Sequence, residues 1–123
     1  MEDFYYRKLN VYNEAMALLG EVYALTKKFP THELHGLTNQ LQRAAVSVPS
    51  NIAEGMGRFS IKERIRFIEI SNGSLMELMC QLEIALLLGY IHESELKLTE
   101  RRVADIAKMI IGLRRNLENK NNV

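Results

Sequence analysis

Residues 60–89 read SIKERIRFIEISNGSLMELMCQLEIALLLG, and they carry the longest helical pattern in the chain. Apolar residues recur in this segment at spacings of three and four, which is the repeat of one face of an α-helix. The segment opens with Ser60-Ile61-Lys62-Glu63, a capping box, and Gly89 follows its last apolar repeat. We therefore predict a helix over residues 61–88. Its main stripe consists of Ile61, Ile65, Ile68, Asn72, Leu75, Met79, Leu82 and Leu86.

The same spacing on both sides of this segment predicts three more helices, at about residues 8–28, 33–54 and 94–118. Pro30 ends the first of these. Gly55 and Gly57 close the second, since a left-handed residue commonly follows a helix end. Ser94 can cap the fourth helix, and the five residues after Glu118 are expected to fray.

Short connections make neighbouring helices antiparallel, and no stretch alternates with the period of two that a strand requires. The predicted fold class is therefore all-α, an antiparallel up-and-down four-helix bundle. A chain of 123 residues and 14.2 kDa holds a single such domain over residues 1–123, because two independent cores would not fit.

Pro49 lies inside the apolar stripe of the second helix. It has no N–H for the carbonyl four residues earlier, and its ring crowds that turn, at a cost of about 3 kcal/mol. We expect a kink near Val48, with the helix continuing to Glu54. The alternative is a break, after which Ser50 or Asn51 starts a short helix.

The helix over residues 61–88 is apolar on a second face, whereas a bundle needs one buried stripe per helix, about 100° wide. Self-association is the simplest explanation of the second face. The alternative is that this helix lies unusually deep in the core of the monomer. The residues that we assign to a candidate oligomer interface are Phe67, Ile70, Leu78 and Leu88.

The composition excludes several classes of protein. With 47% hydrophobic and 25% charged residues the chain is not disordered. Its net charge of +1 does not by itself indicate a polyanionic partner. The single cysteine, Cys80, excludes an intrachain disulfide and fits a reducing compartment. The acidic, aromatic start lacks the features of a signal peptide, so we expect a cytoplasmic protein without a membrane segment.

Three histidines are the candidates for a metal site. His32 and His35 flank the turn between the first two helices, and His92 lies between the last two, so the bundle brings all three to one end. With Glu33 or Glu93 they could hold a metal, which makes a metal-dependent enzyme one alternative function. Their spacing matches no standard site, so we favour solvated loop histidines and expect no metal and no cofactor.

No arrangement of residues indicates catalysis. Cys80 lies in the middle of a helix and is expected to be a packed thiol. The serines have no nucleophile-elbow setting, and Ser71 and Ser74 are interpreted as small residues that permit close helix approach. Gly55-Met56-Gly57 is too short a match to a nucleotide-binding loop. We therefore predict a non-enzymatic protein without a small-molecule substrate.

Asn72 occupies a predicted core position, where its amide needs hydrogen-bonding partners. Gln40, Arg43, Asn51 and Glu54 on the second helix are the candidates. We expect this network to fix the register of the helices, as a polar core residue does in coiled coils, rather than to form a ligand pocket.

The charges are not uniform along the bundle. One end gathers the N-terminus, the turn between the second and third helices and the C-terminus, with nine cations against five carboxylates, a net charge of +4. A ring of several copies would place such ends side by side, and they would then bind phosphates without reading bases. The cations are Arg7, Lys8, Arg58, Lys62, Arg64, Arg66, Arg114, Arg115 and Lys120.

The segment LTNQLQRAAVSVPSNIAEG at residues 37–55 is specific, and Phe29-Pro30, Arg58-Phe59-Ser60 and the string GSLMEL at residues 73–78 accompany it. Together these residues resemble the bacterial four-helix bundle proteins encoded within intervening sequences of 23S rRNA genes, which are also called ribosomal-protein-like. The residues to which we assign an architectural role, holding the kink and a subunit contact, are Arg43, Ser47, Pro49, Asn51, Glu54, Gly55 and Asn72.

The resemblance implies a four-helix bundle that forms homopentamers, and it implies no catalytic residues. A similar pentameric bundle is the accessory variability protein of diversity-generating retroelements, which binds reverse transcriptase and nucleic acid. We therefore expect a homopentameric binding module that contacts structured RNA or a nucleoprotein through its basic rim. The alternatives are a protein–protein interaction scaffold, or a reverse-transcriptase accessory subunit without independent RNA binding.

Overall fold

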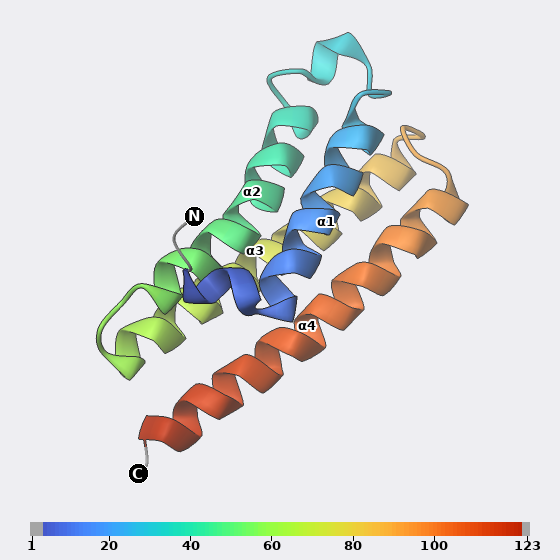
Figure 1. The fold of residues 1–123 in the computed structure, drawn as a ribbon. Helices are drawn as coiled ribbons and strands as arrows, with labels where there is room; N and C mark the ends of the chain where they lie inside the picture. The colour runs from blue at the N-terminus through green and yellow to red at the C-terminus, as the bar shows by residue number, and fades with distance from the viewer. Residues whose placement is uncertain (1–3, 122–123) are drawn as a thin grey trace.

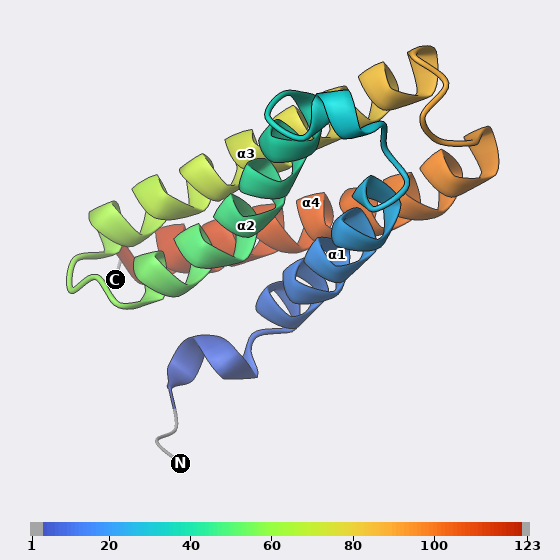
Figure 2. The same cartoon turned by 90° about the horizontal axis from the view of Figure 1, so that it is seen from above.

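The computed structural model of the protein describes residues 4–121, which form four long helices and two short 3₁₀ turns. The elements, in chain order, are η1 (Tyr5–Lys8), α1 (Asn10–Thr26), η2 (Thr31–Glu33), α2 (Leu37–Met56), α3 (Ile61–Leu87) and α4 (Glu93–Asn121). Each helix runs antiparallel to the next (Figure 1). The α2–α3 turn and the C-terminus lie at one end of the bundle, and the other two connections lie at the opposite end (Figure 2).

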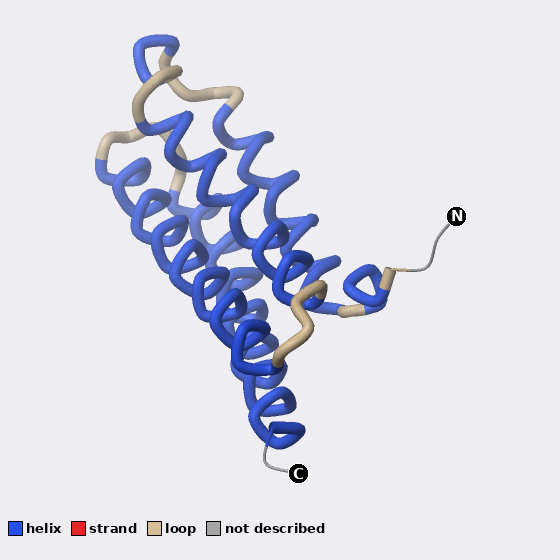
Figure 3. Tube along the Cα trace, turned by 90° about the vertical axis from the view of Figure 1, so that its left-hand side faces the viewer, coloured by secondary structure: helices blue, strands red, loops and turns tan. Residues whose placement is uncertain are grey.

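The predicted all-α, up-and-down four-helix bundle is confirmed. Figure 3 shows helices joined by short loops, and residues 4–121 contain no strand. Within the same range, no helix combines the length and the apolar character that crossing a lipid bilayer requires.

Local contacts at the helix starts explain where the observed bounds depart from the predicted ones. The first helix starts at Asn10 rather than at residue 8, because Leu9 is extended (φ −79°, ψ 127°) and separates η1 from α1. The second starts at Leu37 rather than at residue 33, and the Glu33 carboxylate accepts the Leu37 N–H at 3.1 Å. At the start of α3, the hydroxyl of Ser60 accepts the N–H of the residue three positions on at 3.1 Å, as the capping box predicts.

The fourth helix is longer than predicted at both ends. It begins at Glu93, so Ser94 lies inside the helix and is not its cap. The Glu95 carboxylate accepts the backbone N–H of His92 at 2.9 Å instead, and this satisfies one of the donors that a helix start leaves free. The helix continues through residues 119–121, so the predicted fraying is wrong there; the last two residues lie outside the described part of the chain.

The left-handed glycine that we predict after the second helix occurs after α3 instead. Gly57 has φ −87°, and Gly55 lies within α2. Gly89 has φ +78°, a backbone conformation that residues with a Cβ rarely adopt. Beside it, the N–H of Tyr90 bonds to the carbonyl of Ala85 at 2.9 Å, which is the long hydrogen bond of a Schellman motif.

The hydrophobic core explains part of the second apolar face of α3. Leu78 and Ala85 are completely buried within the monomer, so the deep position of α3 accounts for them, and Leu78 does not belong to an exposed interface. Ile70 and Leu88, by contrast, are exposed, and Phe67 is half-buried. The largest fully buried side chains of the core are Leu18, Leu41, Ile52, Ile68, Leu75, Leu78, Leu82 and Ile106.

Candidate nucleic-acid interface

Pro49 lies at a polar junction between α2 and α3. The helix α2 continues through Pro49, which excludes the alternative of a break followed by a new helix. The hydroxyl of Ser71, completely buried on α3, donates to the backbone carbonyl of Val48 at 2.8 Å. A buried hydroxyl needs such a partner, so Ser71 is both a small residue at a close contact and a hydrogen-bonding link between the two helices.

A second link between α2 and α3 lies at Ser47, one residue before Val48. The hydroxyls of Ser47 and Ser74 are 2.7 Å apart, across the α2–α3 contact. The amide of Asn51 donates to the carbonyl and the hydroxyl of Ser47, at 2.8 and 2.9 Å. The polar residues around Pro49 are therefore occupied in joining α2 to α3, and this supports an architectural role for them.

Gly55 lets the two helices approach closely. An ideal Cβ at this position would lie 2.9 Å from Cβ of Phe67 and 3.3 Å from the backbone oxygen of Arg64. The first distance is shorter than real Cβ contacts, so a side chain here would push α3 away. The glycine serves helix packing rather than a turn.

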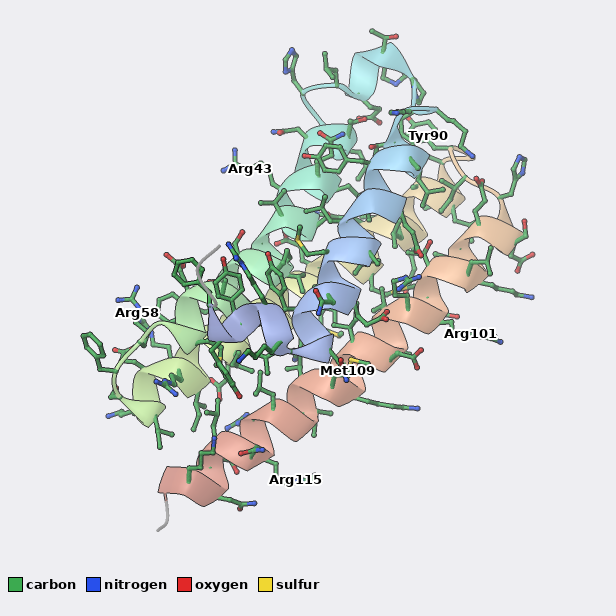
Figure 4. The ribbon with its side chains drawn as sticks, viewed as in Figure 1. Arg43, Arg58, Tyr90, Arg101, Met109 and Arg115 are labelled. Carbon is green, nitrogen blue, oxygen red and sulfur yellow. The ribbon has the colours of Figure 1, made fainter. Side chains whose placement is uncertain are left out.

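The network predicted around Asn72 does not form. Asn72 is half-buried, and its side chain makes no hydrogen bond with any residue in the range 4–121. Arg43 and Glu54 are exposed on α2, and Figure 4 shows Arg43 projecting from the outer side of that helix. Asn51, one of the four expected partners of Asn72, bonds to Ser47 instead.

The three histidines are not brought together as a metal site, since no group of three or more potential ligands occurs among the described residues. His32 lies 3.4 Å from the Tyr90 hydroxyl, which donates to the Glu33 carboxylate at 2.8 Å. The Leu37 N–H and the Tyr90 hydroxyl lower the pKa of Glu33, and the same bond to Glu33 raises the pKa of Tyr90. This cluster ties the α1–α2 connection to the α3–α4 connection.

Cys80 does not pack in the core. It lies on the exposed side of α3, so the prediction of a packed thiol is wrong. Met79 and Leu82 belong to the main stripe and face the core. Cys80 lies between these two residues in the sequence, but its side chain points to the opposite side of the helix.

The predicted basic rim comes from three elements at one end of the bundle. Arg58 lies in the α2–α3 turn. Three cations lie on the first turns of α3 (Lys62, Arg64 and Arg66), and three lie near the end of α4 (Arg114, Arg115 and Lys120). Figure 4 shows Arg58 and Arg115 in the half of the bundle where the chain ends, and Arg101 farther back along α4. Arg7 and Lys8 lie on η1, before α1. We call the α2–α3 turn together with these parts of α3 and α4 the basic end.

Ion pairs within the basic end neutralise two of its cations. Arg114 contacts Glu69 at 2.9 Å and Glu118 at 2.8 Å, and Arg66 contacts Glu63 at 3.5 Å. The net charge of +4 calculated from the sequence omits Glu69, and counting this residue lowers it to +3. Two of the carboxylates in that count, at positions 2 and 3, lie outside the described residues.

Five cations of the basic end make no ion pair with a carboxylate in the described part of the chain: Arg58, Lys62, Arg64, Arg115 and Lys120. The guanidinium of Arg58 lies 4.4 Å from the centre of the Phe67 ring, and Nε of Arg64 donates to the backbone carbonyl of Arg58 at 2.7 Å. These contacts orient two guanidinium groups without neutralising them, so both remain available to an anion.

Phe59 is the residue of this end that sequence reasoning missed. Its side chain is fully exposed (102%), whereas Phe67 on the neighbouring helix is half-buried. The sequence does hold a signal for this exposure. Phe59 lies in the turn of four residues between Met56 and Ile61, and no residue of that turn faces the core. An exposed aromatic ring among unpaired cations is the composition of a surface that binds single-stranded nucleic acid.

A cleft of about 680 Å³ lies between α1 and α4, and its charge differs from that of the basic end. Its lining carries four carboxylates and three cations. Arg102 is held between Glu21 at 2.6 Å and Glu14 at 2.5 Å, and these carboxylates raise its pKa. Arg102 thus ties α4 to α1, and the cleft does not attract a polyanion because carboxylates outnumber cations in its lining.

Comparison with known proteins is consistent with this structure. A crystal structure of a protein of unknown function from the S23 ribosomal protein family of Bacteroides thetaiotaomicron has the same fold, with a TM-score of 0.77 at 20% sequence identity. The match covers 85% of this chain and 97% of that one. No curated protein matches significantly. Residues 7–112 match the sequence profile of the family described as 23S rRNA-intervening sequence protein. The chain therefore belongs to the family of 23S rRNA-intervening sequence proteins.

Proposed function

We propose that this protein is a binding module that contacts RNA, free or within a nucleoprotein, through its basic end. The observation that supports this proposal is the group of five cations without carboxylate partners. The description of the family links it to sequences within rRNA genes, and this favours RNA over other polyanions.

The chemistry of the contact follows from the side chains available. Exposed arginine and lysine side chains neutralise phosphates and release counterions, so the affinity falls steeply as salt concentration rises. Such contacts position the protein on RNA but do not read its sequence. The proposed role of the basic end is therefore to hold RNA.

We further propose that the protein acts as a homopentamer. The exposed side of α3 carries Ile70, Met76, Ile84 and Leu87, which are 39–83% exposed. Apolar side chains in such a row commonly mark a contact with another protein surface. Five copies around one axis would bring five basic ends together and strengthen the field that attracts RNA. Light scattering should then give a mass near 71 kDa, five times the 14.2 kDa chain, and a monomeric mass would exclude the pentamer.

Two exposed arginines of α4 provide a matched test of the RNA contact. Arg115 lies at the basic end and Arg101 lies nearer the other end, and neither has an ion-pair partner in the described part of the chain (Figure 4). In fluorescence anisotropy with labelled RNA, Arg115→Ala should weaken binding for every RNA sequence, and Arg101→Ala should leave it unchanged. Equal effects of the two substitutions would show that the contact is not localised at the basic end.

The second candidate function is a protein-interaction scaffold without an RNA role, and the exposed apolar residues of α3 favour it. Filter binding at about 50 mM salt distinguishes the two functions, because phosphate contacts are strongest at low salt. RNA retained on the filter supports the binding module. A complete absence of retention at low salt favours the scaffold.

A further inference from the structure

Phe59 lies in a turn that hydrogen bonds hold on both sides. Before it, the N–H of Gly57 bonds to the carbonyl of Ala53 at 3.2 Å, and the N–H of Arg58 bonds to Gly55 at 3.1 Å. After it, the carbonyl of Ser60 accepts an N–H of α3 at 3.1 Å, and the Ser60 hydroxyl caps that helix. The backbone of the turn that carries the ring is therefore held in place, and binding does not have to order the turn first.

Cations lie next to this ring along the chain. Nε of Arg64 donates to the carbonyl of Arg58, so its guanidinium lies against the peptide that joins Arg58 to Phe59. Lys62 lies on the first turn of α3, three positions after the ring, and has no carboxylate partner among the described residues. The nearest acid in sequence, Glu63, already contacts Arg66. A ligand that covers the ring therefore meets an excess of positive charge.

We propose that Phe59 is a stacking platform for an unpaired nucleobase, and that Arg58, Lys62 and Arg64 neutralise the adjacent phosphates. The ligand class is then single-stranded RNA, or an unpaired loop or bulge, rather than a continuous duplex. An aromatic ring can stack only on a base whose face is free, and the bases of an A-form helix are stacked on each other. This inference rests on the proposed function and specifies its ligand.

The positive charge of the basic end disfavours the basic end of a second copy of this chain as the partner that covers the ring. A second copy that covered the ring with its own basic end would press cations against cations, and like charges repel, whereas the proposed pentamer only sets the basic ends side by side. A nucleotide strand supplies both a flat apolar face for the ring and negative charge for the cations. The observed combination of a fully exposed ring on an ordered turn and guanidinium groups without carboxylate partners therefore fits a nucleotide strand better than a second basic end.

The absence of tryptophan from the chain makes a direct test possible. The variant Phe59→Trp has a single tryptophan at the platform, and stacking on a base quenches its emission. The control variant Leu34→Trp has its tryptophan at an exposed position in the α1–α2 connection, at the opposite end of the bundle. Each is titrated with an oligouridylate of about eight nucleotides and with a blunt RNA duplex whose two strands are each of about that length.

The expected result is quenching of Phe59→Trp by the single strand only, and no quenching of Leu34→Trp. Phe59→Ala should weaken binding of the single strand about 5- to 150-fold and leave duplex binding unchanged, since stacking contributes to the single strand alone. Unchanged emission and unchanged affinity, with salt-sensitive RNA binding retained, would overturn the platform but not the proposed function. No binding of either RNA at low salt would overturn both. A change of oligomeric mass in Phe59→Ala would assign the ring to a protein contact and also overturn the platform.

Discussion

Replacing Gly55 by alanine tests whether the signature segment, residues 37–55, holds α2 and α3 in close contact. The added Cβ would lie 2.9 Å from Cβ of Phe67 and 3.3 Å from the Arg64 backbone oxygen. Neither atom is the far end of a flexible side chain, so the helices must separate by some tenths of an ångström. Overpacking of this kind costs about 1–3 kcal/mol. Alanine offsets this by up to about 1 kcal/mol, since it is a better helix former than glycine.

The free energy of unfolding should therefore fall by about 1–2 kcal/mol, which lowers Tm by roughly 4–8 °C for a chain of this size. Thermal unfolding followed by circular dichroism, at one fixed protein concentration, measures the change. Gly112→Ala in α4 is the matched control, because a Cβ there has no atom within 4 Å. That variant should gain up to about 1 kcal/mol from helix propensity alone. If Gly55→Ala is as stable as Gly112→Ala, the close approach at Gly55 does not govern the packing of α3.

Two further predictions concern links between the helices and their connections. Ser71→Ala removes the buried donor to the Val48 carbonyl and should cost about 1 kcal/mol in urea unfolding; an unchanged midpoint would show that this bond contributes nothing. Glu33→Gln tests the cluster with Tyr90. The lowered pKa of Glu33 means that its carboxylate stabilises the fold above about pH 4.5 and loses this effect as pH falls through the folded-state pKa. The Tm advantage of wild type over Glu33→Gln should shrink below pH 4.5, and a pH-independent difference would contradict this.

The apolar repeat of the sequence predicts the helices and their order. It does not predict which side chains of one helix contact its neighbours. Leu78 and Ile70 lie on the same stripe of α3, yet Leu78 is buried and Ile70 is exposed. Which residues of a stripe become buried depends on how the neighbouring helices pack against it, and the apolar repeat does not specify that packing. Gly55 illustrates the same limit, since a glycine near a helix end suggests a turn until the neighbouring backbone is placed.

Helix boundaries depended on side-chain capping that the sequence left ambiguous. Both Ser94 and Glu95 can act at the start of α4, and the bond from the His92 N–H to Glu95 places the start one residue before Ser94. The position of Cys80 was missed for a related reason. A residue one step away from a buried position on a helix is turned by about 100°, so neighbours in sequence can face opposite sides.

The candidate site was predicted in outline. Antiparallel topology alone brings Arg58, Lys62 and Arg115 to one end, and the structure places them there. The pairing of Arg114 with Glu69 could not be predicted, because these residues lie on different helices and meet only when α3 and α4 pack. The exposure of Phe59 likewise depends on the path of the α2–α3 turn.

The salt dependence of RNA binding tests the central claim, that unpaired cations of the basic end neutralise RNA phosphates. The measurement is the slope of the logarithm of the binding constant against the logarithm of salt concentration, for wild type and for the triple variant Arg58→Ala, Lys62→Ala, Arg115→Ala. With single-stranded RNA each lost phosphate contact should reduce the slope by about 0.7, so the triple variant should be shallower by about 2. Equal slopes for the two proteins would contradict the claim.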